Sequence, residues 1–80
     1  MTSTKLFRVC AGSRREFQQF CDEFEISHSN ARYVNRDEVL RGVPIGSTIY
    51  LVNTWRLHGN YNSIEVAIKM RQLRRIEVNI

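Results

Sequence analysis

The chain lacks the features of membrane, disulfide-scaffold and disordered proteins. Two cysteines in 80 residues are too few for a disulfide framework. No apolar run approaches the roughly 18 residues that span a bilayer, and the N-terminus shows no secretory signal. Apolar content of 42% and charged content of 25% are ordinary for a globular protein. We therefore expect one cytoplasmic domain over residues 1–80, with a flexible N-terminus at residues 1–4 and no membrane partner.

Motifs for metal, cofactor or covalent chemistry are also missing. Cysteine and histidine show no zinc-ligand spacing, so we expect Cys10 and Cys21 to be buried thiols. The phosphate-binding patterns G-x-x-x-x-G-K-[ST] and G-x-G-x-x-G do not occur, nor does the nucleophile pattern G-x-S-x-G. We predict no cofactor, no metal and no catalytic residue, which makes an enzyme the less favoured class of protein.

The strongest structural signal is a run of large side chains in the middle of the chain. The run consists of Ile49, Tyr50, Leu51 and Val52. It shows no alternation of apolar and polar residues, which is typical of a strand buried on both faces within a parallel sheet. The sequence therefore predicts that residues 48–53 form a central strand with helices above and below it.

Three helices are predicted from cap signals that precede apolar residues. Ser13 and Glu16 have the spacing of a capping box at the start of the first helix. The apolar stripe of this helix, with a period of 3.6 residues, is Phe17, Phe20, Cys21 and Phe24. The same cap spacing predicts a second helix from Asn35 that stops at Gly42, and a third from Ser63, capped by Asn62, to about Leu73.

The other apolar segments predict strands at Lys5–Cys10, Ala31–Val34 and Ile76–Ile80, the last with the alternation of an edge strand. Alternating strands and helices imply a parallel sheet with right-handed crossovers. The predicted fold is a three-layer α/β domain, β-α-β-α-β-α-β, with a four-stranded, mostly parallel sheet in the order 2-1-3-4. The first helix covers one face and the other two cover the opposite face. Because one helix cannot cover four strands, we expect part of its face to stay exposed and to invite a second copy.

Strand order reverses between the first and third strands, where open parallel sheets bind ligands. The candidate ligand residues at this point are Gly12, Ser13, Arg14, Asn53, Thr54 and Trp55. Free N–H groups at a helix N-terminus attract anions, so a nucleotide- or phosphate-binding module is one alternative function. A plain turn and a buried tryptophan explain the same residues without a ligand, and a stacking surface that includes Trp55 is a further possibility.

The net charge is +4, and ten of the twelve basic residues are arginine. Four of them gather near the predicted end of the third helix, namely Lys69, Arg71, Arg74 and Arg75. Positive charge there complements the helix dipole. The same cluster is a candidate surface for nucleic acid or another acidic partner, which is a second alternative function. We favour a protein partner over nucleic acid.

Three segments of the sequence have a familiar pattern. They are Ala31-Arg32-Tyr33-Val34, Val39-Leu40-Arg41-Gly42 and Ser47 to Trp55. Together with the preceding strand and helix, from about Val9, they resemble small bacteriophage-encoded α/β proteins that have no established activity. The resemblance implies a compact accessory protein that acts on a host or phage component in the host cytoplasm. With no catalytic motif present, we expect a non-enzymatic binding or regulatory protein that acts through protein–protein contacts as a homodimer.

Overall fold

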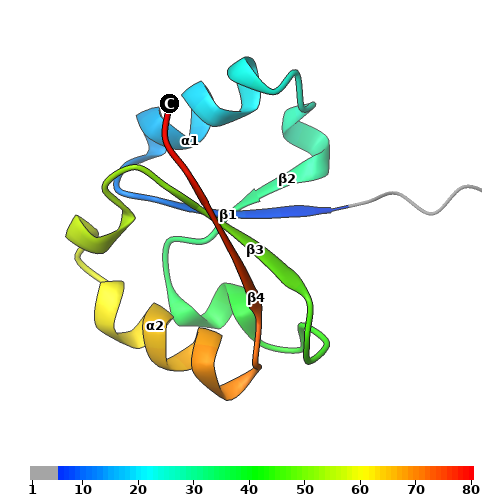
Figure 1. The fold of residues 1–80 in the computed structure, drawn as a ribbon, viewed down its shortest axis with the longest axis vertical. Helices are drawn as coiled ribbons and strands as arrows, with labels where there is room; N and C mark the ends of the chain where they lie inside the picture. The colour runs from blue at the N-terminus through cyan, green and yellow to red at the C-terminus, as the bar shows by residue number, and fades with distance from the viewer. Residues whose placement is uncertain (1–5) are drawn as a thin grey trace, which may run out of the picture.

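The computed structural model describes residues 6–80 (Figure 1). Its strands are β1 (Phe7–Ala11), β2 (Ala31–Tyr33), β3 (Thr48–Val52) and β4 (Arg74–Val78). The α-helices of this range are α1 (Arg14–Glu23) and α2 (Tyr61–Met70), and its short 3₁₀ helices are η1 (His28–Asn30), η2 (Asp37–Leu40) and η3 (Trp55–Leu57). The predicted flexible segment at residues 1–4 and the first residue of the predicted first strand, Lys5, lie outside the described residues.

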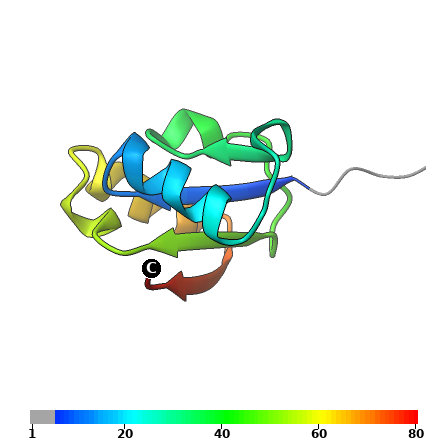
Figure 2. The same ribbon diagram turned by 90° about the horizontal axis from the view of Figure 1, so that it is seen from above.

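The four strands form one parallel sheet in the order β2-β1-β3-β4. Figure 2 shows them side by side, with β2 at one edge and β4 at the other. Tyr50 of β3 is paired with Val9 of β1 on one side and with Ile76 of β4 on the other. The predicted fold class, the strand order and the interior place of β3 are therefore confirmed.

One helical layer lies on each face of the sheet, as predicted (Figure 1). α1 packs on one face, and η2 with α2 packs on the other. Because side chains alternate along a strand, β3 sends Ile49 and Leu51 into the core beneath α2 and Tyr50 and Val52 toward α1. This double coverage is why the apolar run of β3 shows no alternation.

α1 follows its sequence signals closely. The Ser13 hydroxyl accepts the backbone N–H of Glu16 at 3.3 Å and so caps the helix. The buried part of its apolar stripe is Phe17, Phe20 and Cys21. Phe24 follows the helix and is 51% exposed. The last residue of the predicted stripe thus lies at the surface rather than in the core.

The predicted second helix is wrong in type and extent. η2 is a short 3₁₀ helix over Asp37–Leu40 that follows Arg36, and no side chain caps it. Asn35, the predicted cap, instead accepts a 2.8 Å hydrogen bond on its backbone carbonyl from the side-chain amide of Asn60. Two apolar residues before Gly42 bury too little surface to support several α-helical turns, whose nucleation is unfavourable.

The third helix begins two residues earlier than predicted. α2 starts at Tyr61, and no side-chain hydrogen bond caps it. Tyr61 packs on Trp55 with ring centroids 5.1 Å apart, so tertiary packing rather than a cap fixes this end. Asn62, the predicted cap, therefore lies within the helix.

The last strand also begins earlier than predicted. α2 ends at Met70, and Gln72, with φ of 51°, turns the chain toward β4. β4 then runs from Arg74, whose N–H joins the sheet by donating to the carbonyl of Ser47 at 2.8 Å. Arg74 and Arg75 thus belong to the edge strand and not to the end of the helix. The predicted edge position of this strand is confirmed.

Candidate functional site

Glu16 fills the predicted ligand crevice at the carboxyl ends of β1 and β3. Its carboxylate accepts the backbone N–H of Gly12 at 3.2 Å, and its two oxygens accept the hydroxyl of Thr54 at 3.0 and 2.9 Å. Ser13 caps the helix beside it, and Arg14 is exposed. The N-terminus of α1 thus already holds a carboxylate where a phosphate would bind. A second anion at this position would be repelled.

The remaining residues predicted for this crevice serve packing. The side-chain amide of Asn53 makes two hydrogen bonds with the backbone of Ile80, at 2.9 and 3.3 Å. Trp55 is 1% exposed and belongs to the core beneath α2, so its ring offers no stacking surface. A Cβ atom on Gly12 would lie only 2.4 Å from the Thr54 hydroxyl oxygen. Of the six residues, Gly12 and Thr54 are brought together through Glu16. The contacts of the six favour a structural turn, and ligand binding there stays a prediction.

The four basic residues predicted as one cluster divide between two elements and their connection. Lys69 is exposed on α2, and Arg71 donates to a backbone carbonyl at 3.3 Å. Arg75 forms a salt bridge with Glu65 at 2.6 Å. Arg74, the neighbour of Arg75 on β4, points to the other face of the sheet because side chains alternate along a strand. Two of the four basic side chains are thus engaged within the chain, and binding of nucleic acid or another acidic partner by this cluster stays a prediction.

Both cysteines are buried free thiols. Burial raises the pKa of Cys10 to about 12, and burial, with a smaller effect of Asp22, raises the pKa of Cys21 above its ordinary value. Both thiols are therefore protonated at neutral pH and shielded from reagents. We expect Ellman's reagent to label neither thiol in the native protein and both after unfolding in guanidinium chloride. Rapid labelling under native conditions would contradict this burial.

An open apolar hollow of about 310 Å³ lies on the α1 face of the sheet, beside β4. Its lining, the apolar groove, consists of Phe7, Phe20, Phe24, Ile26, Tyr50, Ile76 and Val78. Phe24 is 51% and Ile76 is 38% exposed. α1 lies over the other part of this face and leaves the strip next to β4 open. The incomplete coverage expected from the number of helices is thus located here.

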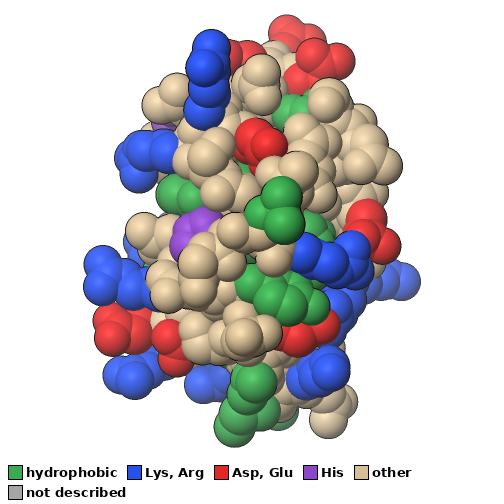
Figure 3. All heavy atoms as spheres, turned by 90° about the vertical axis from the view of Figure 1, so that its left-hand side faces the viewer, with side chains coloured by type: hydrophobic (Ala, Val, Ile, Leu, Met, Phe, Trp, Pro, Cys, Tyr) green, Lys and Arg blue, Asp and Glu red, His purple; other side chains and the backbone are tan. Residues whose placement is uncertain are grey.

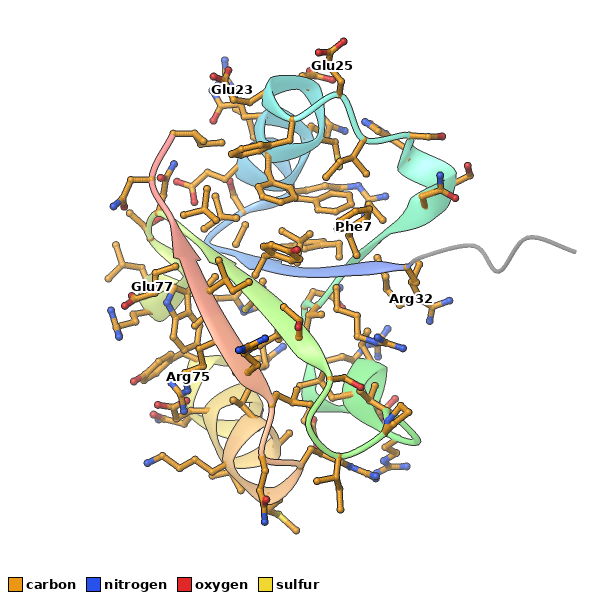
Figure 4. All side chains as sticks on the ribbon, turned by 45° about the vertical axis from the view of Figure 1, so that its right-hand side comes forward. Phe7, Glu23, Glu25, Arg32, Arg75 and Glu77 are labelled. Atoms are coloured by element: carbon orange, nitrogen blue, oxygen red, sulfur yellow. The ribbon has the colours of Figure 1, made fainter. Side chains whose placement is uncertain are left out.

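Aromatic rings shape the apolar groove. The ring centroid of Phe20 lies 5.0 Å from that of Phe24 and 5.6 Å from that of Tyr50, and Phe7 lies 5.8 Å from Tyr50. In Figure 4, Phe7 extends from β1 into the space below α1. Rings that already pack on one another lose little side-chain entropy when a partner covers them.

The fold assembles two surfaces whose residues the sequence did not reveal. For the apolar groove, the number of helices predicted an open part of the α1 face, and the residue signals were only the alternation of Ile76 with Val78 and the position of Phe24 at the end of a stripe. The second surface is a hollow of about 160 Å³ whose lining includes Arg8, Arg32 and Arg41. Arg8 and Arg32 are direct neighbours in the β1–β2 register. This pairing depends on strand alignment, so spacing along the chain gave no signal of it.

The fold and the groove together define a small three-layer α/β domain with an exposed apolar surface. Comparisons of the chain with protein-family models, curated proteins and solved structures found no match. Within residues 6–80, no helix has the length and apolarity needed to cross a membrane. Across the same residues, no three histidine, cysteine or acidic side chains gather in a way that could hold a metal ion.

Proposed function

We propose that the chain is a small non-enzymatic binding or regulatory domain that acts through protein–protein contacts at its apolar groove. The observation that carries this proposal is the exposed strip of apolar side chains between α1 and β4. Following the resemblance of the sequence, we place it in the cytoplasm as a phage accessory protein that acts on a host or phage component.

The chemistry of the groove supports a protein partner. Contiguous exposed apolar patches with polar rims mark protein interaction sites, and aromatic side chains dominate the binding energy of such sites. Phe24 combines high exposure with a packed neighbour, Phe20, so a partner can bury it without rearranging the helix. The crevice at the end of β1 offers less, since Glu16 already occupies it.

The Phe24→Ser variant tests the role of the groove. It removes the most exposed aromatic ring of the lining and leaves the buried core intact, so the domain should fold. We expect tagged wild-type protein to retain a partner from an extract of its native cell, and we expect the variant to lose most of that partner. Truncating an interface aromatic residue typically weakens binding by on the order of 30-fold or more.

The matched control is Leu57→Ser. Leu57 is 80% exposed in η3, outside the apolar groove, so its replacement should retain the partner. Equal retention by the wild type and both variants would contradict a binding role for the groove. Loss from both variants would point instead to a general effect of surface hydrophobicity.

A further inference from the structure

β4 lies at an edge of the sheet, and within residues 6–80 one side of its backbone meets no strand (Figures 1 and 2). The N–H of Arg74 and the C=O of Val78 make hydrogen bonds of 2.8 and 2.9 Å with the residues that flank β3. Both residues thus direct their backbone groups toward β3. Because this direction alternates along a strand, the N–H and C=O groups of Arg75 and Glu77 point outward from the sheet.

The two faces of this edge differ in chemistry. Ile76 and Val78 line the apolar groove on the α1 face. Arg75 and Glu77 lie on the α2 face, and Figure 4 shows them along β4. Each forms a salt bridge with a neighbouring side chain of its own chain. The edge thus presents an apolar face and a face with one charge of each sign.

We propose that two copies of the chain associate through β4, in antiparallel pairing centred on Ile76, so that the two sheets join and the two apolar grooves meet. The inference rests on the proposed function, because it names a second copy as the partner that the groove receives. The copies are related by a two-fold axis, and the same surface of each contacts the other. The pairing also covers an open strand edge, which soluble proteins must otherwise protect.

The charges of β4 select one register. With Ile76 opposite the partner's Ile76, Arg75 lies opposite the partner's Glu77, and Glu77 lies opposite the partner's Arg75. These positions exchange backbone hydrogen bonds through the outward groups, and opposite charges across antiparallel strands stabilise the pair. A shift of two residues places Arg75 opposite the partner's Arg75, or Glu77 opposite the partner's Glu77, which is destabilising. The edge is therefore complementary to itself.

The α1 face agrees with the same register. Ile76 meets the partner's Ile76 at a non-hydrogen-bonded position, where side chains approach most closely. Arg74 lies opposite the partner's Val78, near the end of that strand. A hollow lined in part by the partner's Asp22 and the partner's Glu23 adjoins this end. Figure 3 shows acidic side chains gathered over α1, so a basic residue is brought to an acidic region.

Contact between the two apolar grooves adds buried surface area to the dimer interface, because pairing of the two strands alone buries too little. A stable interface buries on the order of 1,200–2,000 Å² in total, and a five-residue strand edge alone buries much less. Antiparallel pairing at Ile76 places the apolar groove of each copy on the same side of the joined sheet. The exposed side chains that border β4, Phe24 among them, then face the partner rather than water.

Charge variants at the edge test this pairing by light scattering. The wild type should be a dimer. Glu77→Arg and Arg75→Glu each place like charges opposite one another at both positions, which should weaken the dimer by on the order of tenfold. An equimolar mixture of the two variants should dimerise again, because the two arginines of one chain then face the two glutamates of the other. The double variant Arg75→Glu/Glu77→Arg should dimerise as the wild type does.

Glu65→Gln is the matched control for these variants. It removes the partner of Arg75 within the chain and leaves the edge unchanged, so the dimer should persist. A wild-type monomer at the highest soluble concentration would overturn the inference, as would charge variants and mixtures that all match the wild-type mass. Either result leaves the proposed function standing if Phe24→Ser still loses its partner. Conversely, an intact dimer with partner capture insensitive to Phe24 contradicts only that function.

A cysteine at position 76, next to the two-fold axis, tests the pairing of β4 by disulfide cross-linking. Ile76→Cys should form an intermolecular disulfide under mild oxidation, because its Cβ atom would lie about 4.5–5.5 Å from that of the partner. The native thiols are buried and do not compete. Leu57→Cys, which is exposed on η3 and is not part of β4, is the control and should cross-link far more slowly. Equal rates for both variants would overturn the pairing.

Discussion

Replacing Trp55 by alanine is expected to lower the free energy of unfolding by about 3–5 kcal/mol, as truncation of a buried aromatic residue does. Trp55 is 1% exposed, and its ring packs on Tyr61 with centroids 5.1 Å apart. The guanidinium carbon of Arg56 lies over the ring, 5.3 Å from its centroid. A domain of this length has a total stability of about 4–12 kcal/mol. The variant should therefore lose a large fraction of the stability of the domain and unfold at a much lower urea concentration than the wild type.

Trp55→Phe is the informative control for this loss. The indole N–H of Trp55 is buried and has no hydrogen-bond partner among the described residues, and phenylalanine removes that unsatisfied donor while it keeps most of the ring. We expect it to cost less than about 1.5 kcal/mol. Because Trp55 is the single tryptophan, urea unfolding should be followed by far-ultraviolet circular dichroism. Similar midpoints for the alanine and phenylalanine variants would show that the ring does not support the core.

The central part of the fold was predictable because local and tertiary requirements agree there. The run from Ile49 to Val52 has no polar position, so only a strand covered on both faces can bury it. Ser13 caps α1 as its spacing predicts, and the helix buries the first three members of its stripe. The Glu16 carboxylate, however, accepts from Gly12 and Thr54 instead of from the backbone of the cap residue. Once β3 lies inside the sheet, the short connections and right-handed crossovers leave few other strand orders.

The second half of the chain was harder to predict because its cap signals compete with packing. The spacings at Asn35 and at Asn62 resemble that of Ser13, yet neither residue caps a helix. Contact between Tyr61 and Trp55 starts α2 earlier, and the hydrogen bond of Asn60 to Asn35 fixes the preceding loop. Such contacts join residues that are not neighbours in sequence, so periodicity alone could not reveal them.

The sequence predicted that part of the α1 face would stay exposed, but it did not reveal which residues line this candidate site. Counting helices against strands indicated that part of the α1 face would stay open. The groove itself joins Phe7, Phe24, Tyr50 and Ile76, which belong to four separate parts of the chain. Their proximity depends on the strand register, in which Tyr50 lies beside Ile76. The residues of the crevice at the carboxyl ends of β1 and β3 were easier to find, because the loops after parallel strands meet at one edge of the sheet. The hydrogen bonds of Glu16 with Thr54 in this crevice could not be predicted from its cap spacing alone.

The loops that follow β1 and β3 approach each other closely, so a larger side chain at this point should strongly lower the stability of the domain. Gly12→Ala should lower the free energy of unfolding by about 3 kcal/mol, the upper part of the range for an overpacked site. The new Cβ atom would lie 2.4 Å from the Thr54 hydroxyl oxygen and 2.7 Å from its backbone oxygen. The hydroxyl can rotate away, but the backbone oxygen moves only if the turn after β3 moves. The hydrogen bonds of Glu16 to Gly12 and Thr54 would be strained together.

Gly59→Ala is the matched substitution, since no atom lies within 4 Å of its Cβ position and its backbone needs no glycine. It should change stability by less than about 0.5 kcal/mol, and urea unfolding of both variants measures the contrast. Adding Thr54→Ala to Gly12→Ala should recover only part of the loss, because the backbone oxygen remains in place. Full recovery of the free energy of unfolding would show that only the Thr54 hydroxyl clashes with the methyl group at position 12. Equal stability of the two alanine variants would mean that β1 and β3 do not approach closely at this turn.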